Sequence, residues 1–241
     1  MTLSISRVLA DAVALWRRDA NLLVRVGAPF LFLPDYAMRL LLPVPVSADA
    51  AKASFAAAMQ AQAQFVGDHL LAYLAAAAML QFGLAGLFAL YAVGPDVRAA
   101  LRRAGWLWPR LMLAGVLVGV PGMLGLFLLL PGLVVFGRAL LTGPMLASEP
   151  PVSAIGAIAR SVRRTRGDTV AVSCLAAVAL SVRLAAAPFE QIDLWLRSLH
   201  APNPITLAVI DAAGAGASAL AQVAGVLIAV AAYRGLASSG T

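Results

Sequence analysis

The feature that most constrains this chain is an apolar run from Met112 to Ala147, interrupted by Pro131–Gly132. A bilayer core about 30 Å thick is crossed by about 20 helical residues, so the run is too long for one crossing. Proline suits the first turn of a helix, where its missing N–H needs no partner. We therefore expect two helices joined at a hinge formed by Pro131 and Gly132. A basic amphipathic segment, 152–166, follows at once.

The composition excludes a soluble domain. Hydrophobic residues make up 62% of the 241 residues and charged residues only 12%, whereas soluble domains carry about 25% charged residues. The net charge of +7 would suit nucleic acid in a soluble protein. Here the arginines lie beside apolar segments, where they are typical of membrane topology, and no nucleic-acid-binding motif is present. We expect a membrane protein with no nucleic-acid partner.

The pattern predicts an all-α polytopic bundle that forms a single membrane domain over residues 1–241. Three basic amphipathic segments, each followed by a pair of apolar ones, predict interfacial helices and transmembrane hairpins. Gly105 and Gly167 are expected to end the second and third interfacial helices. Whether the three units are true repeats stays open. The interfacial helices are expected at about 3–19, 96–104 and 151–166, and six spans at about 21–43, 69–93, 106–130, 132–147, 169–187 and 205–234.

The distribution of basic residues predicts the orientation. With a cytoplasmic N-terminus, twelve arginines lie on the inner side and only Lys52 and Arg197 on the outer side. The positive-inside rule then places both termini in the cytoplasm. Arg197 belongs to the outer segment 188–204, which we expect to be a short amphipathic stretch on the outer leaflet.

A family resemblance covers about forty residues. It is carried by Pro131-Gly132-Leu133, Arg138, Pro144, Glu149 and a helix containing Ala157, Arg160, Ser161, Thr165 and Gly167. This arrangement resembles the YciC-like proteins, which are related to the membrane domain of some glycerophosphodiester phosphodiesterases. The resemblance implies a multi-pass protein of the bacterial cytoplasmic (inner) membrane with about six helices. It does not extend to the phosphodiesterase domain, so no enzymatic activity is carried over.

Charged residues inside the predicted spans are the first candidates for function, because each costs roughly 2.5–3.5 kcal/mol at a helix centre. Asp35 and Arg39 share a helix face and can form a self-neutralised pair near the outer interface, or line a polar pocket. Arg138, Arg183 and Asp211 belong to three different spans. Pairing of Asp211 with Arg138 or Arg183 would lock helices together, whereas unpaired arginines could bind a phosphate headgroup.

The amphipathic segments supply a second set of candidates. Basic clusters beside a membrane attract anionic lipid headgroups, at about 1 kcal/mol per residue. The candidate contacts on the cytoplasmic side are Arg98, Arg102, Arg103, Arg160, Arg163, Arg164 and Arg166.

No catalytic, cofactor or metal site is expected, because His69 and His200 are isolated in the sequence and no catalytic motif is present. The leading hypothesis is a non-enzymatic membrane protein that organises or senses lipid, or supports a membrane-protein partner. The alternative is a transporter or lipid translocator that uses Arg138, Arg183 and Asp211. An intramembrane lipid enzyme would lack an acid–base set.

Overall fold

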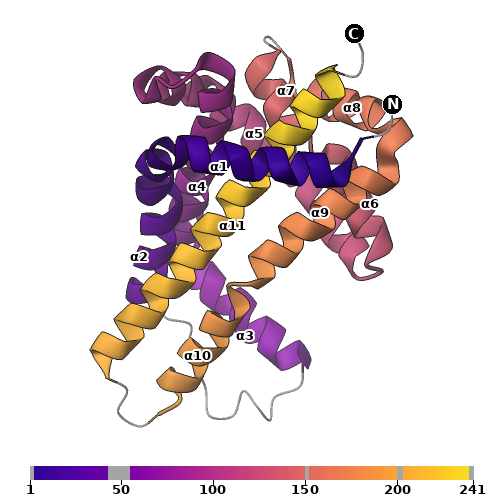
Figure 1. Cartoon of the computed structure of the whole chain (residues 1–241). Coiled ribbons are helices and arrows are strands. Elements are labelled where there is room, and N and C mark those ends of the chain that lie inside the picture. The colour runs from indigo at the N-terminus through magenta and orange to yellow at the C-terminus, as the bar shows by residue number, and fades with distance from the viewer. Residues whose placement is uncertain (1–2, 43–54, 150–151, 200–202, 239–241) are drawn as a thin grey trace.

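A computed structural model describes residues 3–42, 55–149, 152–199 and 203–238. Lys52, His200 and the predicted segment ends at 43 and 151 lie outside these ranges. The all-α prediction is confirmed, since the described residues form helices and no strand (Figure 1). Within the described ranges, five helical segments are long and apolar enough to cross a membrane, which indicates a multi-pass membrane protein. They are 70–93, 97–126, 130–148, 166–197 and 204–237.

The first predicted span is not among these five. Helix α1 (Ile5–Gly27) lies across α11 (Pro204–Ser238) and continues through a π-helix (Ala28–Phe32) into α2 (Leu33–Leu41) (Figure 1). The Leu33 N–H bonds to the Ala28 carbonyl, five residues back, around Pro29, which has no N–H. The interfacial helix expected to end at 19 therefore runs on without a break, and a crossing by this segment stays a prediction.

The expected boundary at Gly105 is wrong. After α3 (Phe55–Asp68) and α4 (Leu70–Val93), α5 runs unbroken from Val97 to Leu126, past Gly105. A glycine ends a helix by adopting a positive φ. Among the described glycines only Gly94 does so, with φ 109°, and it follows α4. Asp96 then caps α5 by accepting hydrogen bonds from the N–H groups of Arg98 and Ala99.

The chain breaks between α5 and α6, close to the expected hinge at Pro131 and Gly132. Helix α6 (Leu130–Ala139) begins one residue earlier than expected, so Pro131 is its second residue. The chain reverses at Leu129, whose φ is +54°, whereas Gly132 lies inside α6. A Cβ atom on Gly132 would lie 2.5 Å from the backbone nitrogen of Leu126. Gly132 is therefore required for close approach of α5 and α6, and it does not make the turn.

The fourth predicted span, 132–147, is divided in two. Helix α7 (Thr142–Ser148) begins two residues before Pro144, which cannot donate a backbone hydrogen bond to residue 140. The third basic amphipathic segment forms helix α8 (Ala154–Arg164), capped by the Ser153 hydroxyl, and its position at a membrane interface stays a prediction. Helix α8 is followed by a 3-10 turn, η2 (Arg166–Asp168). Gly167 lies inside this turn and has no positive φ, so it does not end the helix in the way expected.

The last segments form two long helical stretches. Helix α9 (Thr169–Leu184) matches the fifth predicted span, and α11 (Pro204–Ser238) contains the sixth. The segment expected to rest on the outer leaflet includes helix α10 (Ala187–Arg197), which packs against the first part of α11 (Figure 1). The C-terminal half of α11, including Val226–Ala232, lies in the hydrophobic core.

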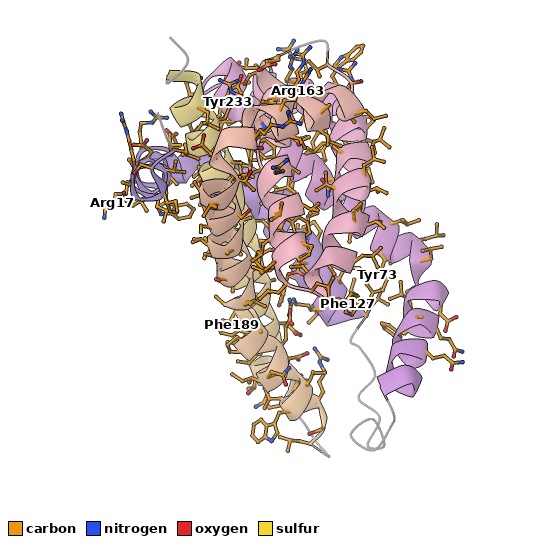
Figure 2. The ribbon with its side chains drawn as sticks, turned by 90° about the vertical axis from the view of Figure 1, so that its right-hand side faces the viewer. Arg17, Tyr73, Phe127, Arg163, Phe189 and Tyr233 are labelled. Atoms are coloured by element: carbon orange, nitrogen blue, oxygen red, sulfur yellow. The ribbon has the colours of Figure 1, made fainter. Side chains whose placement is uncertain are left out.

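The two ends of the bundle differ in charge. The described chain begins and ends toward the same end as α8 (Figure 1). We call this the basic end, and Figure 2 shows Arg17, Arg163 and Tyr233 there. We call the other end, where α2 finishes and α10 meets α11, the acidic end. Arginines of the basic end are Arg7, Arg17, Arg18, Arg98, Arg102, Arg103, Arg160, Arg163, Arg164, Arg166 and Arg234.

Candidate functional site

The acidic end contains a buried charge pair that joins α10 to α11. Arg197 Nη2 donates to Asp211 Oδ2 at 2.8 Å, and Arg197 Nε donates to Asp193 at 2.7 and 2.9 Å. The Asp211 side chain is only 1% exposed. Arg197 therefore bridges a carboxylate on its own helix and a fully buried one on α11.

A second arginine joins α2 to α10. The predicted Asp35–Arg39 pair is present, with 3.4 Å between Arg39 Nε and Asp35 Oδ1. Arg39 Nη2 also donates to Glu190 Oε1 at 3.3 Å, a contact that the sequence pattern does not reveal. A Cβ atom on Gly214 would lie 2.9 Å from Arg39 Nη1, so this glycine leaves room for the guanidinium against α11.

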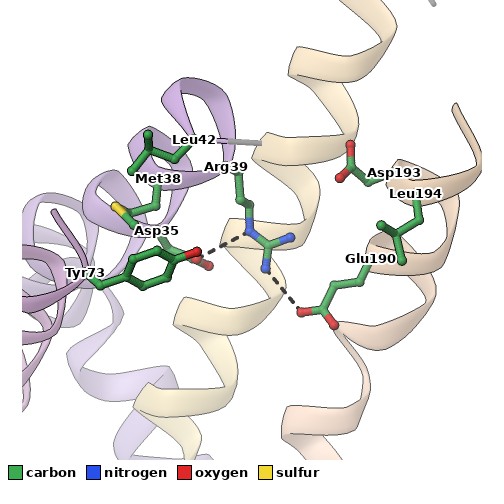
Figure 3. A pocket seen from close by; sticks show the side chains of 8 residues that line it. All are labelled: Asp35, Met38, Arg39, Leu42, Tyr73, Glu190, Asp193 and Leu194. Atoms are coloured by element: carbon green, nitrogen blue, oxygen red, sulfur yellow. Dashed lines mark hydrogen bonds and ion pairs between the residues drawn. The ribbon is translucent and has the colours of Figure 1, made fainter. Parts of the chain in front are cut away.

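These side chains border an open cavity of about 430 Å³ (Figure 3). Its polar wall includes Asp35, Arg39, Glu190 and Asp193, and Tyr73 of α4 lies on the side of α2. The remaining lining residues are Met38, Leu42 and Leu194. We call this space the outer pocket.

Neither pairing considered for Asp211, with Arg138 or with Arg183, occurs among the described residues. Arg138 Nη2 donates to Thr169 Oγ1 at 3.0 Å, near the basic end. Arg183 is exposed on α9, and the described part of the chain offers it no ion pair. Asp211 pairs with Arg197 instead, because α10 returns along α11. No ion pair in the described part of the chain joins these three residues to one another.

At the basic end, Glu149 holds α8 against α11. Its carboxylate accepts hydrogen bonds from Arg160 at 3.0 Å and from the Tyr233 hydroxyl at 3.0 Å. Arg164 lies 3.9 Å from the same carboxylate and 5.1 Å from the centre of the Tyr233 ring. The three partners come from α8 and α11, so Glu149, which directly follows α7, is held to both helices.

The candidate lipid-binding arginines divide into two groups. Arg160 and Arg164 contact Glu149, and Arg103 donates to the Ala147 carbonyl at 3.4 Å. The other four are exposed, and within the described ranges they have no ion pair. These four are Arg98, Arg102, Arg163 and Arg166.

A cavity of about 300 Å³ lies beside two of the candidate lipid contacts. Arg102, Arg103 and Trp106 line it, together with Val93 and Ala99. The Trp106 ring is 75% exposed, unlike most aromatic residues of the bundle. Arginine beside an exposed tryptophan is the arrangement expected where a helix leaves the hydrocarbon core for the headgroup region.

The residues that carry the family resemblance make contacts with one another. The Ser161 hydroxyl donates to the Arg138 carbonyl at 2.6 Å, and Glu149 pairs with Arg160. Ser161 and Thr165 are fully buried, and the Thr165 hydroxyl donates to the Ser161 carbonyl at 2.8 Å. These residues dock α8 onto α6 and thus have a structural explanation.

Helix α1 has its own charge pair at the basic end. Arg18 donates to both oxygens of Asp19 at 2.9 and 2.8 Å. This hydrogen bonding holds the pKa of the Asp19 carboxyl below its usual range.

Within the described ranges, no three His, Cys, Asp or Glu residues are arranged to hold a metal ion. Comparison of the chain with family models, curated proteins and solved structures gives no match. The resemblance to YciC-like proteins therefore stays a prediction.

Proposed function

We propose that this chain is a non-enzymatic integral membrane protein that binds anionic phospholipid headgroups at its basic end. The observation that carries the proposal is a set of four exposed arginines that have no ion pair within the described ranges. They are Arg98, Arg102, Arg163 and Arg166, and Arg102 lines a cavity together with the exposed Trp106. A guanidinium group donates two parallel hydrogen bonds to a phosphate, which makes arginine well suited to this role.

The orientation follows from the same charges. Basic residues concentrate on the cytoplasmic side of membrane proteins, so we place the basic end and both termini in the cytoplasm. The resemblance to YciC-like proteins supports a bacterial inner membrane. In that membrane the protein would organise lipid around itself or support a membrane-protein partner.

The test is native mass spectrometry of the protein from nanodiscs that contain phosphatidylglycerol and phosphatidylcholine. The test variant combines four substitutions, Arg98→Gln, Arg102→Gln, Arg163→Gln and Arg166→Gln. It should retain at least tenfold less phosphatidylglycerol than the wild type. Loss of four contacts of about 1 kcal/mol each would allow phosphatidylglycerol binding to weaken by more than this tenfold.

The matched control is Arg183→Gln, which removes one exposed arginine outside the basic end. It should retain phosphatidylglycerol like the wild type. Equal retention by the folded fourfold variant and the wild type would contradict the proposal.

A further inference from the structure

We propose that the outer pocket binds a ligand through a primary ammonium group attached to a hydrocarbon part. This inference concerns the acidic end, and it stands apart from anionic lipid binding at the basic end.

The charges around the pocket do not balance. Four carboxylates, Asp35, Glu190, Asp193 and Asp211, share two guanidinium groups. Arg39 already contacts two of these carboxylates, and Arg197 contacts the other two. With all six groups ionised, the network has a formal net charge of −2, so a cation that entered the pocket would be attracted.

Hydrogen-bond acceptors also remain unused. Asp35 lines the pocket, and its Oδ2 atom is buried without a hydrogen-bond partner. In the same network Asp211 is 1% exposed, and its Oδ1 atom is likewise without a partner. Buried carboxylate oxygens are rarely left unpaired, because the cost of burial is then not compensated. Of these two residues only Asp35 lines the pocket, and a ligand with several N–H groups would supply the missing donor to its carboxylate.

The pocket walls favour an organic ammonium over a metal ion. No metal-binding group of three His, Cys, Asp or Glu residues occurs in the described ranges. Met38, Leu42 and Leu194 provide an apolar wall, and Tyr73 adds an aromatic ring. An ammonium group is attracted to an aromatic face, and its hydrocarbon part would pack against the apolar wall. A volume of about 430 Å³ is sufficient for a headgroup-sized ligand.

Two sources could supply this chemistry, an aminophospholipid of the adjacent leaflet and a soluble alkylamine. For the lipid source, the full-length protein is reconstituted in phosphatidylethanolamine or phosphatidylcholine nanodiscs, and retained lipid is counted by native mass spectrometry. For the soluble source, n-hexylamine is titrated against the phosphatidylcholine sample, and the unfolding temperature is measured.

The test variant is Glu190→Gln, because Glu190 is 55% exposed and its loss leaves Arg39 paired with Asp35. We expect at least fivefold weaker binding of whichever probe the wild type binds. The control is Asp68→Asn, which removes an exposed carboxylate that does not line the pocket and should bind like the wild type.

Each outcome decides the proposal. Selective retention of phosphatidylethanolamine assigns the ligand to the lipid, and saturable stabilisation by n-hexylamine assigns it to a soluble amine. Binding of neither probe overturns the proposal, as does unchanged binding by Glu190→Gln. Equal retention of phosphatidylcholine and phosphatidylethanolamine rejects a primary ammonium. None of these results depends on the basic end, so the two proposals fail separately.

Discussion

Replacement of Arg197 by methionine should destabilise the protein strongly. The substitution keeps most of the side-chain volume but removes the one cation that, among the described residues, hydrogen-bonds to Asp211, which is 1% exposed. Breaking a buried ion pair on one side costs about 3–5 kcal/mol, because the remaining charge is left without a partner. Arg197→Met also releases Asp193 from its hydrogen bonds at 2.7 and 2.9 Å.

The converse substitution should cost less. In Asp211→Asn, Arg197 keeps both hydrogen bonds to Asp193, and its side chain is 15% exposed. We expect a loss of about 1–3 kcal/mol, the range for removing a partner from a buried polar group. The double variant Arg197→Met, Asp211→Leu should be more stable than Arg197→Met alone, since no buried charge remains.

The assay is thermal unfolding in nanodiscs, followed by tryptophan fluorescence, with Trp195 of α10 as a local reporter. At 2–4 °C per kcal/mol, Arg197→Met should lower the unfolding temperature by roughly 6–20 °C. Arg183→Met, which removes an exposed arginine from α9, should change it by less than about 2 °C.

Three results would refute the reasoning. The first is a fall in unfolding temperature of less than about 2 °C for Arg197→Met. The second is a larger loss of stability for Asp211→Asn than for Arg197→Met, and the third is a double variant that is no more stable than Arg197→Met.

Three further predictions test other parts of the fold. Gly132→Ala should cost about 1–3 kcal/mol in thermal unfolding, because the added Cβ would lie 2.5 Å from a backbone nitrogen, whereas Gly119→Ala meets no atom within 4 Å and should be tolerated. Glu149→Gln should speed amide hydrogen exchange selectively in α8, because it weakens the contacts to Arg160 and Arg164; uniform exchange would contradict this. Because the pKa of Asp19 is lowered in the folded state, its pairing stabilises the fold above the ordinary value of 3.8 and is lost as pH falls below it. The difference in unfolding temperature between wild type and Asp19→Asn should therefore shrink on acidification from pH 5 to pH 3, and a growing difference would reverse the assigned sign.

Hydrophobic length predicted the long central helices well. The expected span 69–93 corresponds to Leu70–Val93, and 205–234 lies within Pro204–Ser238. The expected ends at 19 and 104 were not helix ends, because amphipathicity reports the surroundings of a residue and not the continuity of its backbone. One helix can leave the interface and enter the bilayer while every backbone hydrogen bond is kept. Gly105 does not end the helix, because it does not adopt the positive φ of a helix-terminating glycine.

The charged contacts were less predictable. Asp35 and Arg39 are four residues apart, so helical geometry alone predicted their pair. Arg197 and Asp211 are joined only because α10 folds back along α11. The sequence predicts Arg197 in an outer segment separate from the spans, so only Arg138 and Arg183 are expected as partners of Asp211. Asp193 and Arg197 have the same four-residue spacing as Asp35 and Arg39, and they too form an ion pair within one helix.

The residues behind the family resemblance make structural contacts in this chain. Gly132 permits close approach to Leu126, Ser161 docks on the Arg138 carbonyl, and Glu149 pairs with Arg160. Contacts of this kind fix how helices pack, and folds of one kind carry different functions. The resemblance therefore predicts a shared packing of α5 to α8 and no shared ligand. Ligand specificity is to be sought outside those contacts, first at exposed Arg102 and at Glu190 in the outer pocket.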